Sequence, residues 1–265
     1  MKFNMKSLVV AAALVAAGAA NASSLTLTPG GSVTDQGWTV SGLSGSGTLS
    51  FSSDLLGALY AGSVDVAQVD PAQVTIVGSL ADGGFTQVSA AAPITGLTGT
   101  FDGTTVSVSQ VATAGGALQT SYADDFTNSG GSLEIKNLRV DLGAKIVYAD
   151  LVGGNGVGEK NGIALWNIGS ITGPTSITAA EGTFTVTNHL SQLSITDQAF
   201  GYFIDSLGIM TGGYGVLQGI KDYGSIDSTI TVTATKVPSV PEPSTYALMG
   251  LGLVGMSLVA RRRAK

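Results

Sequence analysis

Hydrophobic and polar residues alternate in short runs over most of the chain, which is the period of a strand with one buried face. Residues 73–77 and 133–140 alternate in this way. Residues 183–187 and 228–233 do so too, and Thr fills most of their polar positions. The Asp102-Gly103 pair, set between apolar segments, is a strong hairpin signal. The pattern predicts short antiparallel strands joined by tight turns.

Two segments depart from this alternation and have helical spacing. Residues 54–60 form one of them, and residues 197–207 form the other. In the second, the apolar residues recur at intervals of three and four, with Thr196 or Asp197 as N-cap and Gly208 as stop. Each segment follows a strand-like run that ends in Ser, Thr or Asp. This repeated strand-to-helix pattern indicates two related halves merged into one domain.

We therefore predict a mainly β fold, an antiparallel β-sandwich with two short helices, over residues 23–236. A signal helix precedes this body and a hydrophobic helix follows it. The predicted organisation is a signal peptide at 1–22, the body at 23–236, a Pro-rich linker at 237–245 and a sorting helix with a basic tail at 246–265.

The N-terminus has the order of parts of a secretory signal peptide. Two lysines precede an apolar run over residues 8–20, and an A-x-A pattern ends at Ala22. We expect the Sec translocon to export the chain and signal peptidase to cleave it between Ala22 and Ser23.

The C-terminus has three zones of different physical character. Three prolines in residues 237–245 keep the backbone extended and remove hydrogen-bond donors. The apolar residues 246–260 would form roughly 22 Å of helix at about 1.5 Å per residue, shorter than a typical membrane span. Arg261, Arg262 and Arg263 mark the cytoplasmic side. The zones predict transient anchoring in the inner membrane, with the body outside.

This tail, with Pro241, Glu242 and Pro243 ahead of the short apolar helix and the arginines, resembles the PEP-CTERM sorting signal. The resemblance implies recognition by an exosortase, a membrane transpeptidase-like protease. It also implies release to the cell surface or the extracellular space. Members of this class are commonly associated with exopolysaccharide and biofilm matrix, and the tail also ends some ice-binding proteins.

Composition narrows the classes of partner. Hydrophobic residues make up 44% of the chain and charged residues 11%, with 38 glycines and no cysteine. The body holds six Lys and Arg against 17 Asp and Glu, a net charge of −11. An acidic body lacks the basic footprint that nucleic acids require. Without Cys, disulfides and thiolate sites are excluded.

Candidate catalytic and ligand residues are few. His189 is the only histidine, and no G-x-S-x-G elbow accompanies it, so we interpret it as a surface or packing residue. The Gly-rich residues 153–158 lack the Lys of a phosphate loop and predict a turn between strands. We expect no cofactor; a structural Ca²⁺ stays an alternative because carboxylates gather at Asp124-Asp125, with Asp150 and Glu159 further on. Trp38 and Trp166 are predicted to pack in the core.

Residues 133–235 are similar to HtaA-like haem-capture domains, over 138–140, 147–150, 163–165 and 178–182. The segment in which that family's Trp-Gly pair leads to a haem-binding Tyr is not found. The similarity thus implies a β-sandwich fold, and Tyr148 with His189 is the only haem pair to consider.

The functional hypothesis is a non-catalytic surface or matrix protein that contacts exopolysaccharide or neighbouring cells. A surface module that binds a glycan, haem or ice is the alternative, and a secreted hydrolase is a weaker one. An ice binder needs regular Thr ladders. The Thr-x-Thr pieces within 26–28, 183–187 and 231–235 are too far apart in the sequence to show one.

Overall fold

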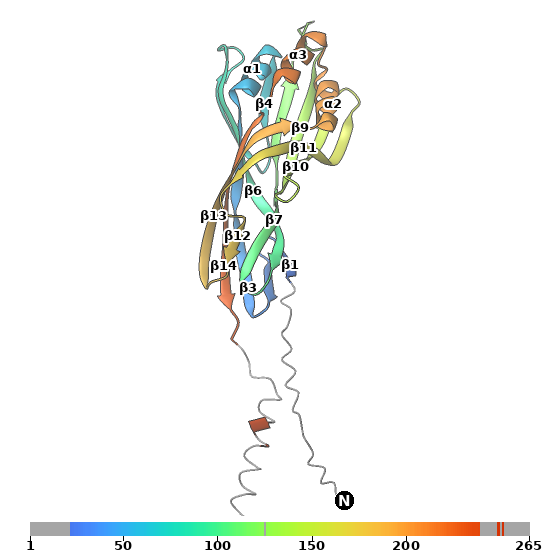
Figure 1. The fold of residues 1–265 in the computed structure, drawn as a ribbon. Coiled ribbons are helices and arrows are strands. Elements are labelled where there is room, and N and C mark those ends of the chain that lie inside the picture. The colour runs from blue at the N-terminus through green and yellow to red at the C-terminus, as the bar shows by residue number, and fades with distance from the viewer. Residues whose placement is uncertain (1–21, 125, 239–247, 250, 252–265) are drawn as a thin grey trace, which may run out of the picture.

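The computed structural model describes residues 22–124, 126–238, 248, 249 and 251. Its body runs from β1 to β14 and is drawn in Figure 1. The strands are β1 (Ser23–Leu27), β2 (Ser32–Asp35), β3 (Trp38–Phe51), β4 (Val64–Val69), β5 (Gln73–Ser79), β6 (Gly84–Phe101), β7 (Thr105–Thr113), β8 (Gly116–Ser121), β9 (Gly131–Asp141), β10 (Ile146–Gly153), β11 (Gly158–Thr172), β12 (Ser176–Thr178), β13 (Gly182–Ile195) and β14 (Gly224–Lys236). The helices are α1 (Ser53–Ala61), α2 (Asp197–Leu207) and α3 (Thr211–Gly219).

All strands of the described residues belong to one 14-stranded antiparallel sheet. Its main path runs β12-β7-β6-β3-β14-β13-β11-β10-β9-β8-β4. β7 also pairs with β9, with Val111 opposite Val140 at the centre of the pairing. This pairing closes the strands from β7 to β9 along the path into a ring. The prediction of a mainly β, antiparallel fold with short helices is confirmed. The structure adds that the two faces expected to form a sandwich belong to one continuous, self-closing sheet.

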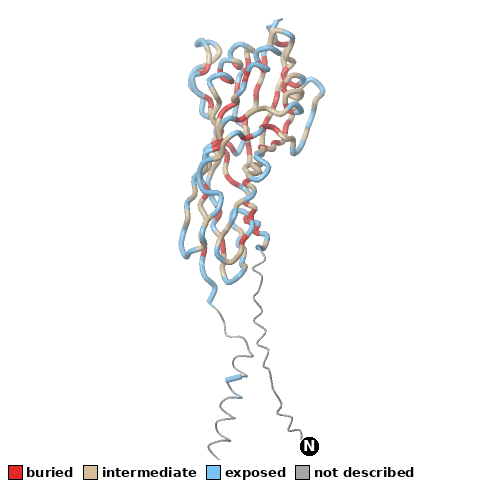
Figure 2. The backbone as a smooth tube through the Cα atoms, in the orientation of Figure 1, coloured by how far each residue is buried: buried red, intermediate tan, exposed pale blue. Residues whose placement is uncertain are grey.

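The molecule is elongated, and its interior contains two hydrophobic clusters (Figure 2). The larger cluster lies where the helices pack on the sheet and includes Leu133 and Leu165 of the sheet and Phe203 of α2. The smaller cluster lies at the opposite end and includes Leu27 and Ile230. Inward residues alternate with outward ones along the long strands, as the sequence pattern requires.

Helices α1 and α2 start in the same way, which supports the idea of two related halves. The hydroxyl of Ser52 accepts a hydrogen bond from Leu55 N, and that of Thr196 accepts one from Ala199 N. Each cap residue directly follows a long strand, Ser52 after β3 and Thr196 after β13. The predicted helix over 197–207 is confirmed, and Gly208 ends it in the left-handed conformation at φ 63°.

The third helix, α3, was not predicted. Its sequence contains four glycines, and glycine weakens a helix by about 1 kcal/mol relative to alanine. Tertiary contact explains the helix. A Cβ on Gly213 would lie 2.5 Å from Thr127 O and one on Gly212 would lie 2.7 Å from Phe126 O, so these glycines permit a close approach that other residues would block.

Both ends of the body lie at the end of the molecule away from the helices (Figure 1). Ser23, which begins β1, pairs with Phe101 of β6. Lys236, which ends β14, pairs with Trp38 of β3. We call this the terminal end and the opposite one the helical end. A chain held by its C-terminal tail would present its helical end and its long sheet faces outward.

A hydroxyl-rich sheet face as the candidate functional site

Four neighbouring strands near the terminal end carry almost only Ser and Thr on their outer side. We call this surface the Ser/Thr face. Strand order β13-β14-β3-β2 places these positions side by side. Its members are Thr183, Thr185 and Thr187 on β13; Thr229, Thr231, Thr233 and Thr235 on β14; Thr39, Ser41, Ser44, Ser46 and Thr48 on β3; and Ser32 and Thr34 on β2.

The register of β13 and β14 aligns the threonines directly opposite one another. Thr185 pairs with Thr231, and Thr183 pairs with Thr233. Their hydroxyls lie within hydrogen-bond distance, 3.1 Å for the first pair and 3.0 Å for the second. Adjacent strands are about 4.8 Å apart, and alternate residues along a strand about 6.7 Å apart. The result is a regular array of uncharged hydroxyls.

The same register corrects one expectation from the sequence. Two of the three Thr-x-Thr pieces, judged too far apart to form a ladder, form one because β13 and β14 are hydrogen-bonded neighbours. The third piece does not join them: Thr26 lies on β1 and pairs with Thr98 of β6. Alternate threonines in two separate strands were the available signal, but sequence alone does not say which strands are adjacent.

Ionisable groups border the Ser/Thr face on these strands. At its upper border, His189 Nδ1 lies 2.7 Å from Asp227 Oδ1, and both side chains are exposed. At the terminal end, the backbone N–H of Lys236 donates to Glu181 Oε1 at 3.3 Å. His189 is therefore a surface residue in the structure, as the sequence predicted.

The one haem pair that the sequence allowed is not brought together. Both residues are adjacent to β11: Tyr148 pairs with Ala164, whereas His189 pairs with Thr172. Their partners on β11 are eight residues apart, which corresponds to roughly 26 Å along the strand at about 3.3 Å per residue. Instead, the guanidinium of Arg139 lies over the Tyr148 ring, with its Cζ atom 4.3 Å from the ring centroid. These residues thus give no support to a shared haem site.

The carboxylates considered for calcium have local partners. Asp124 accepts hydrogen bonds from the Thr127 hydroxyl and from nearby backbone N–H groups, which hold the pKa of its carboxyl well below its usual range. Asp125 lies outside the described residues. Asp150 accepts from Asn137 Nδ2 at 3.0 Å and from Gly162 N at 2.9 Å. Within the described ranges, no three His, Asp or Glu side chains are grouped as metal ligands.

Several expectations fall on parts of the chain outside the described residues. They include residues 1–21 of the predicted signal peptide, the sorting motif and the basic stop. The described body begins its first strand at Ser23 and ends its last at Lys236. Of the helices that the structure describes, none combines the length and apolar character needed to cross a membrane.

Comparison with protein-family models finds a PEP-CTERM protein-sorting motif over residues 239–263. The matched segment contains Pro241, Glu242, Pro243 and the three arginines at 261–263. The motif implies a secreted protein that an exosortase processes and that is directed to the surface. The comparisons do not show the HtaA-like similarity of residues 133–235. No curated protein and no solved structure matched significantly.

Proposed function

Because the chain carries a PEP-CTERM sorting signal, we propose that it is a non-catalytic surface or matrix protein whose Ser/Thr face contacts extracellular polysaccharide. The observation that carries this proposal is the in-register array of Thr hydroxyls on β13 and β14. Each hydroxyl can donate and accept, as the hydroxyls of a sugar polymer do. A regular array of such groups suits a repeating, polyhydroxylated partner.

Charge supports the same partner. The body is strongly acidic, yet the Ser/Thr face itself is uncharged. The acidic surface of the rest of the body would repel an anionic polymer. The uncharged Ser/Thr face would not, so it can contact a neutral or weakly acidic one. Affinity for such a polymer would come from many weak contacts. Each sugar repeat that binds raises the effective concentration of the neighbouring repeat at the face.

The position of the face is suited to this role. The face lies along the long side of the molecule, on strands whose terminal end leads into the sorting tail (Figure 1). The protein would link the cell or its released products to the surrounding polymer without chemical reaction.

The proposal is tested with the secreted protein and polysaccharide from the producing cells. Thr185→Val with Thr229→Val removes two exposed hydroxyls and leaves side-chain shape almost unchanged. Each lost hydrogen bond costs about 0.5–1.5 kcal/mol, so co-sedimentation with the polymer should weaken about tenfold. The control, Thr75→Val with Thr86→Val, changes two exposed threonines near the helical end. Equal binding by all three proteins would refute the proposal.

An ice surface is a second candidate, favoured by the regular spacing of the same ladder. Its test is thermal hysteresis of the purified protein. A hysteresis gap that the Thr185→Val, Thr229→Val variant loses, together with unchanged polysaccharide binding, would replace the first proposal by this one.

A further inference from the structure

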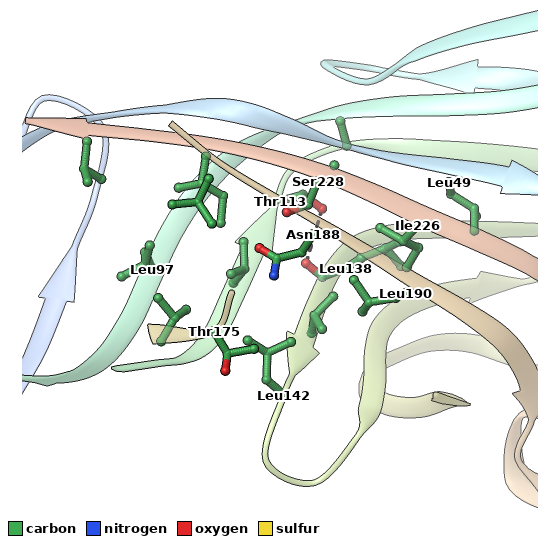
Figure 3. A pocket seen from close by; sticks show the side chains of 18 of the residues that line it. Leu49, Leu97, Thr113, Leu138, Leu142, Thr175, Asn188, Leu190, Ile226 and Ser228 are labelled. Carbon is green, nitrogen blue, oxygen red and sulfur yellow. Dashed lines mark hydrogen bonds between the residues drawn. The ribbon is translucent and has the colours of Figure 1, made fainter. Parts of the chain in front are cut away.

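A cavity of about 120 Å³ lies inside the sheet, and its wall is almost entirely apolar. Figure 3 shows its central part, where Leu97, Leu138 and Ile226 face the space from different strands. Asn188 and Thr175 are among the few polar residues of the wall. The cavity is on the opposite side of β13 and β14 from the Ser/Thr face, because inward and outward residues alternate along these strands.

The cavity is long relative to its volume. Its wall includes Ile226 and Ala234, eight residues apart on β14, which corresponds to roughly 26 Å of strand. At the helical end the wall includes Phe203 and Tyr223, and at the terminal end it includes Leu25. A narrow space of this length fits a single alkyl chain better than a ring system.

Two residues of the wall carry buried hydrogen-bond donors that have no partner among the described residues. The donors are the indole Nε1 of Trp166 and the hydroxyl of Tyr223, in side chains that are 3% and 1% exposed. Burial raises the pKa of the Tyr223 phenol, so it keeps its proton. Buried donors without partners are costly, and Trp and Tyr normally find one when buried. A ligand oxygen that reaches the helical end of the cavity would give these two donors an acceptor.

A seam between β12 and β13 gives access to the cavity. β12 pairs with β7, and β13 pairs with β14 and β11, so no ladder among the described strands joins β12 to β13. The two sides are held together where Asn188 Nδ2 donates to Pro174 O at 2.9 Å. Wall residues along the seam, among them Thr175 and Val186, are exposed or half-buried.

We propose that the cavity binds a neutral single-chain amphiphile: an alkyl chain with an uncharged oxygen that accepts hydrogen bonds from Trp166 and Tyr223. Among the described residues the wall contains no Lys, Arg or His, so a buried carboxylate would have no counter-charge. A neutral alcohol or ester is therefore preferred over the fatty acid anion of equal length. This site is independent of the Ser/Thr face and of the function proposed for it.

The test uses the secreted protein and 1-alkanols from hexanol to dodecanol, with native mass spectrometry for stoichiometry and tryptophan fluorescence for affinity. One alkanol per chain should bind, about fourfold more tightly for each added methylene until the cavity is full. Decanol should bind at least tenfold more tightly than decanoate at pH 8. Absence of alkanol binding, or equal affinity for decanoate, would overturn the proposal.

Two substitutions locate the ligand. Tyr223→Phe removes one donor without changing the size of the ring and should weaken decanol binding about tenfold, whereas Tyr214→Phe, at an exposed tyrosine, should not. Val186→Trp narrows the seam and should abolish binding, whereas Thr187→Trp, which faces outward, should preserve it. Wild-type affinity in Tyr223→Phe would contradict the assigned acceptor position. Equal affinity in the two Trp variants would contradict the cavity as the site.

Discussion

The hydroxyls of Thr185 and Thr231 lie 3.1 Å apart across β13 and β14, at the centre of the Ser/Thr face. The pair links residues 46 positions apart in the sequence. Its geometry depends on the whole sheet, because β13 must pair with β14 in this register for any of the threonines to meet. The predictions below separate what this surface contributes to binding from what holds the sheet together.

The Thr185–Thr231 pair should contribute little to folding. Both hydroxyls are near solvent, and valine favours strands at least as well as threonine. The unfolding free energy of Thr185→Val should therefore stay within about 0.5 kcal/mol of wild type in urea titrations. A loss well above that value would show that the ladder is a structural element, and the binding comparison would then have to be made with exposed Thr229 alone.

The cap residue of α2 should matter more. The Thr196 hydroxyl accepts from Ala199 N and donates to Ala164 O at 2.5 Å, so it joins the helix to β11. Thr196→Ala should lower the unfolding free energy by about 1–2 kcal/mol. Ser53→Ala, in the first turn of α1 but without the cap role, is the control and should change it by less than about 0.5 kcal/mol. Equal effects of the two changes would contradict the assigned cap.

Two glycines should respond to alanine in opposite directions. Gly45 has φ 131°, and a Cβ there would lie 2.0 Å from Thr229 O, so Gly45→Ala should destabilise the β3–β14 pairing by several kcal/mol. Gly57 lies in α1 with open space around it, so Gly57→Ala should stabilise the protein by about 0.5–1 kcal/mol. Thermal unfolding of both variants checks the two signs.

Acid should weaken the junction between β7 and β9. Asp141 accepts from Ala144 N at 2.8 Å and from Gln110 Nε2 at 2.9 Å, and the first of these chiefly lowers the pKa of its carboxyl. With a folded-state pKa below the unfolded value of about 3.9, its contribution to stability is complete above that pH and is lost as the pH falls through the folded-state pKa. Urea unfolding between pH 7 and pH 2 should show a smaller decline for Asp141→Asn than for wild type.

If the unfolding free energies of the wild type and of Asp141→Asn fell equally as the pH is lowered, Asp141 would not contribute to this acid sensitivity. Asp102 and Asp124 also accept several hydrogen bonds, and the pKa of each carboxyl is lowered in the same direction. Asp102 is half-buried and Asp124 is exposed, and neither lies at the β7–β9 junction, so their replacement by Asn serves as the comparison at sites outside it.

Local features of the fold could be predicted from the sequence because they depend on neighbouring residues. The Asp102-Gly103 turn forms where expected, with Phe101 opposite Val106. The helix over 197–207 follows from its apolar spacing and its caps. Helix α3 could not be predicted, since its glycines are explained only by contact with a segment more than 80 residues earlier.

The candidate sites depend on long-range pairing, which the sequence pattern does not contain. Alternation along residues 183–187 indicates a strand with an outer row of Thr, but the neighbour of that strand is set by the sheet order. Likewise, Trp166 was predicted to pack in the core and is buried, as is Tyr223. Only the structure shows that both residues line one cavity and that their donors have no partner in the part of the chain that it describes.

The central claim, that the Ser/Thr face attaches this exported protein to the extracellular polymer, is tested most directly in the producing cells. The measurement is the fraction of the protein that stays with the isolated matrix after washing. The account predicts that the Thr185→Val, Thr229→Val protein is secreted at wild-type level but is largely lost to the medium, while the Thr75→Val, Thr86→Val protein is retained. Full retention of the first variant, with normal secretion, would contradict the claim.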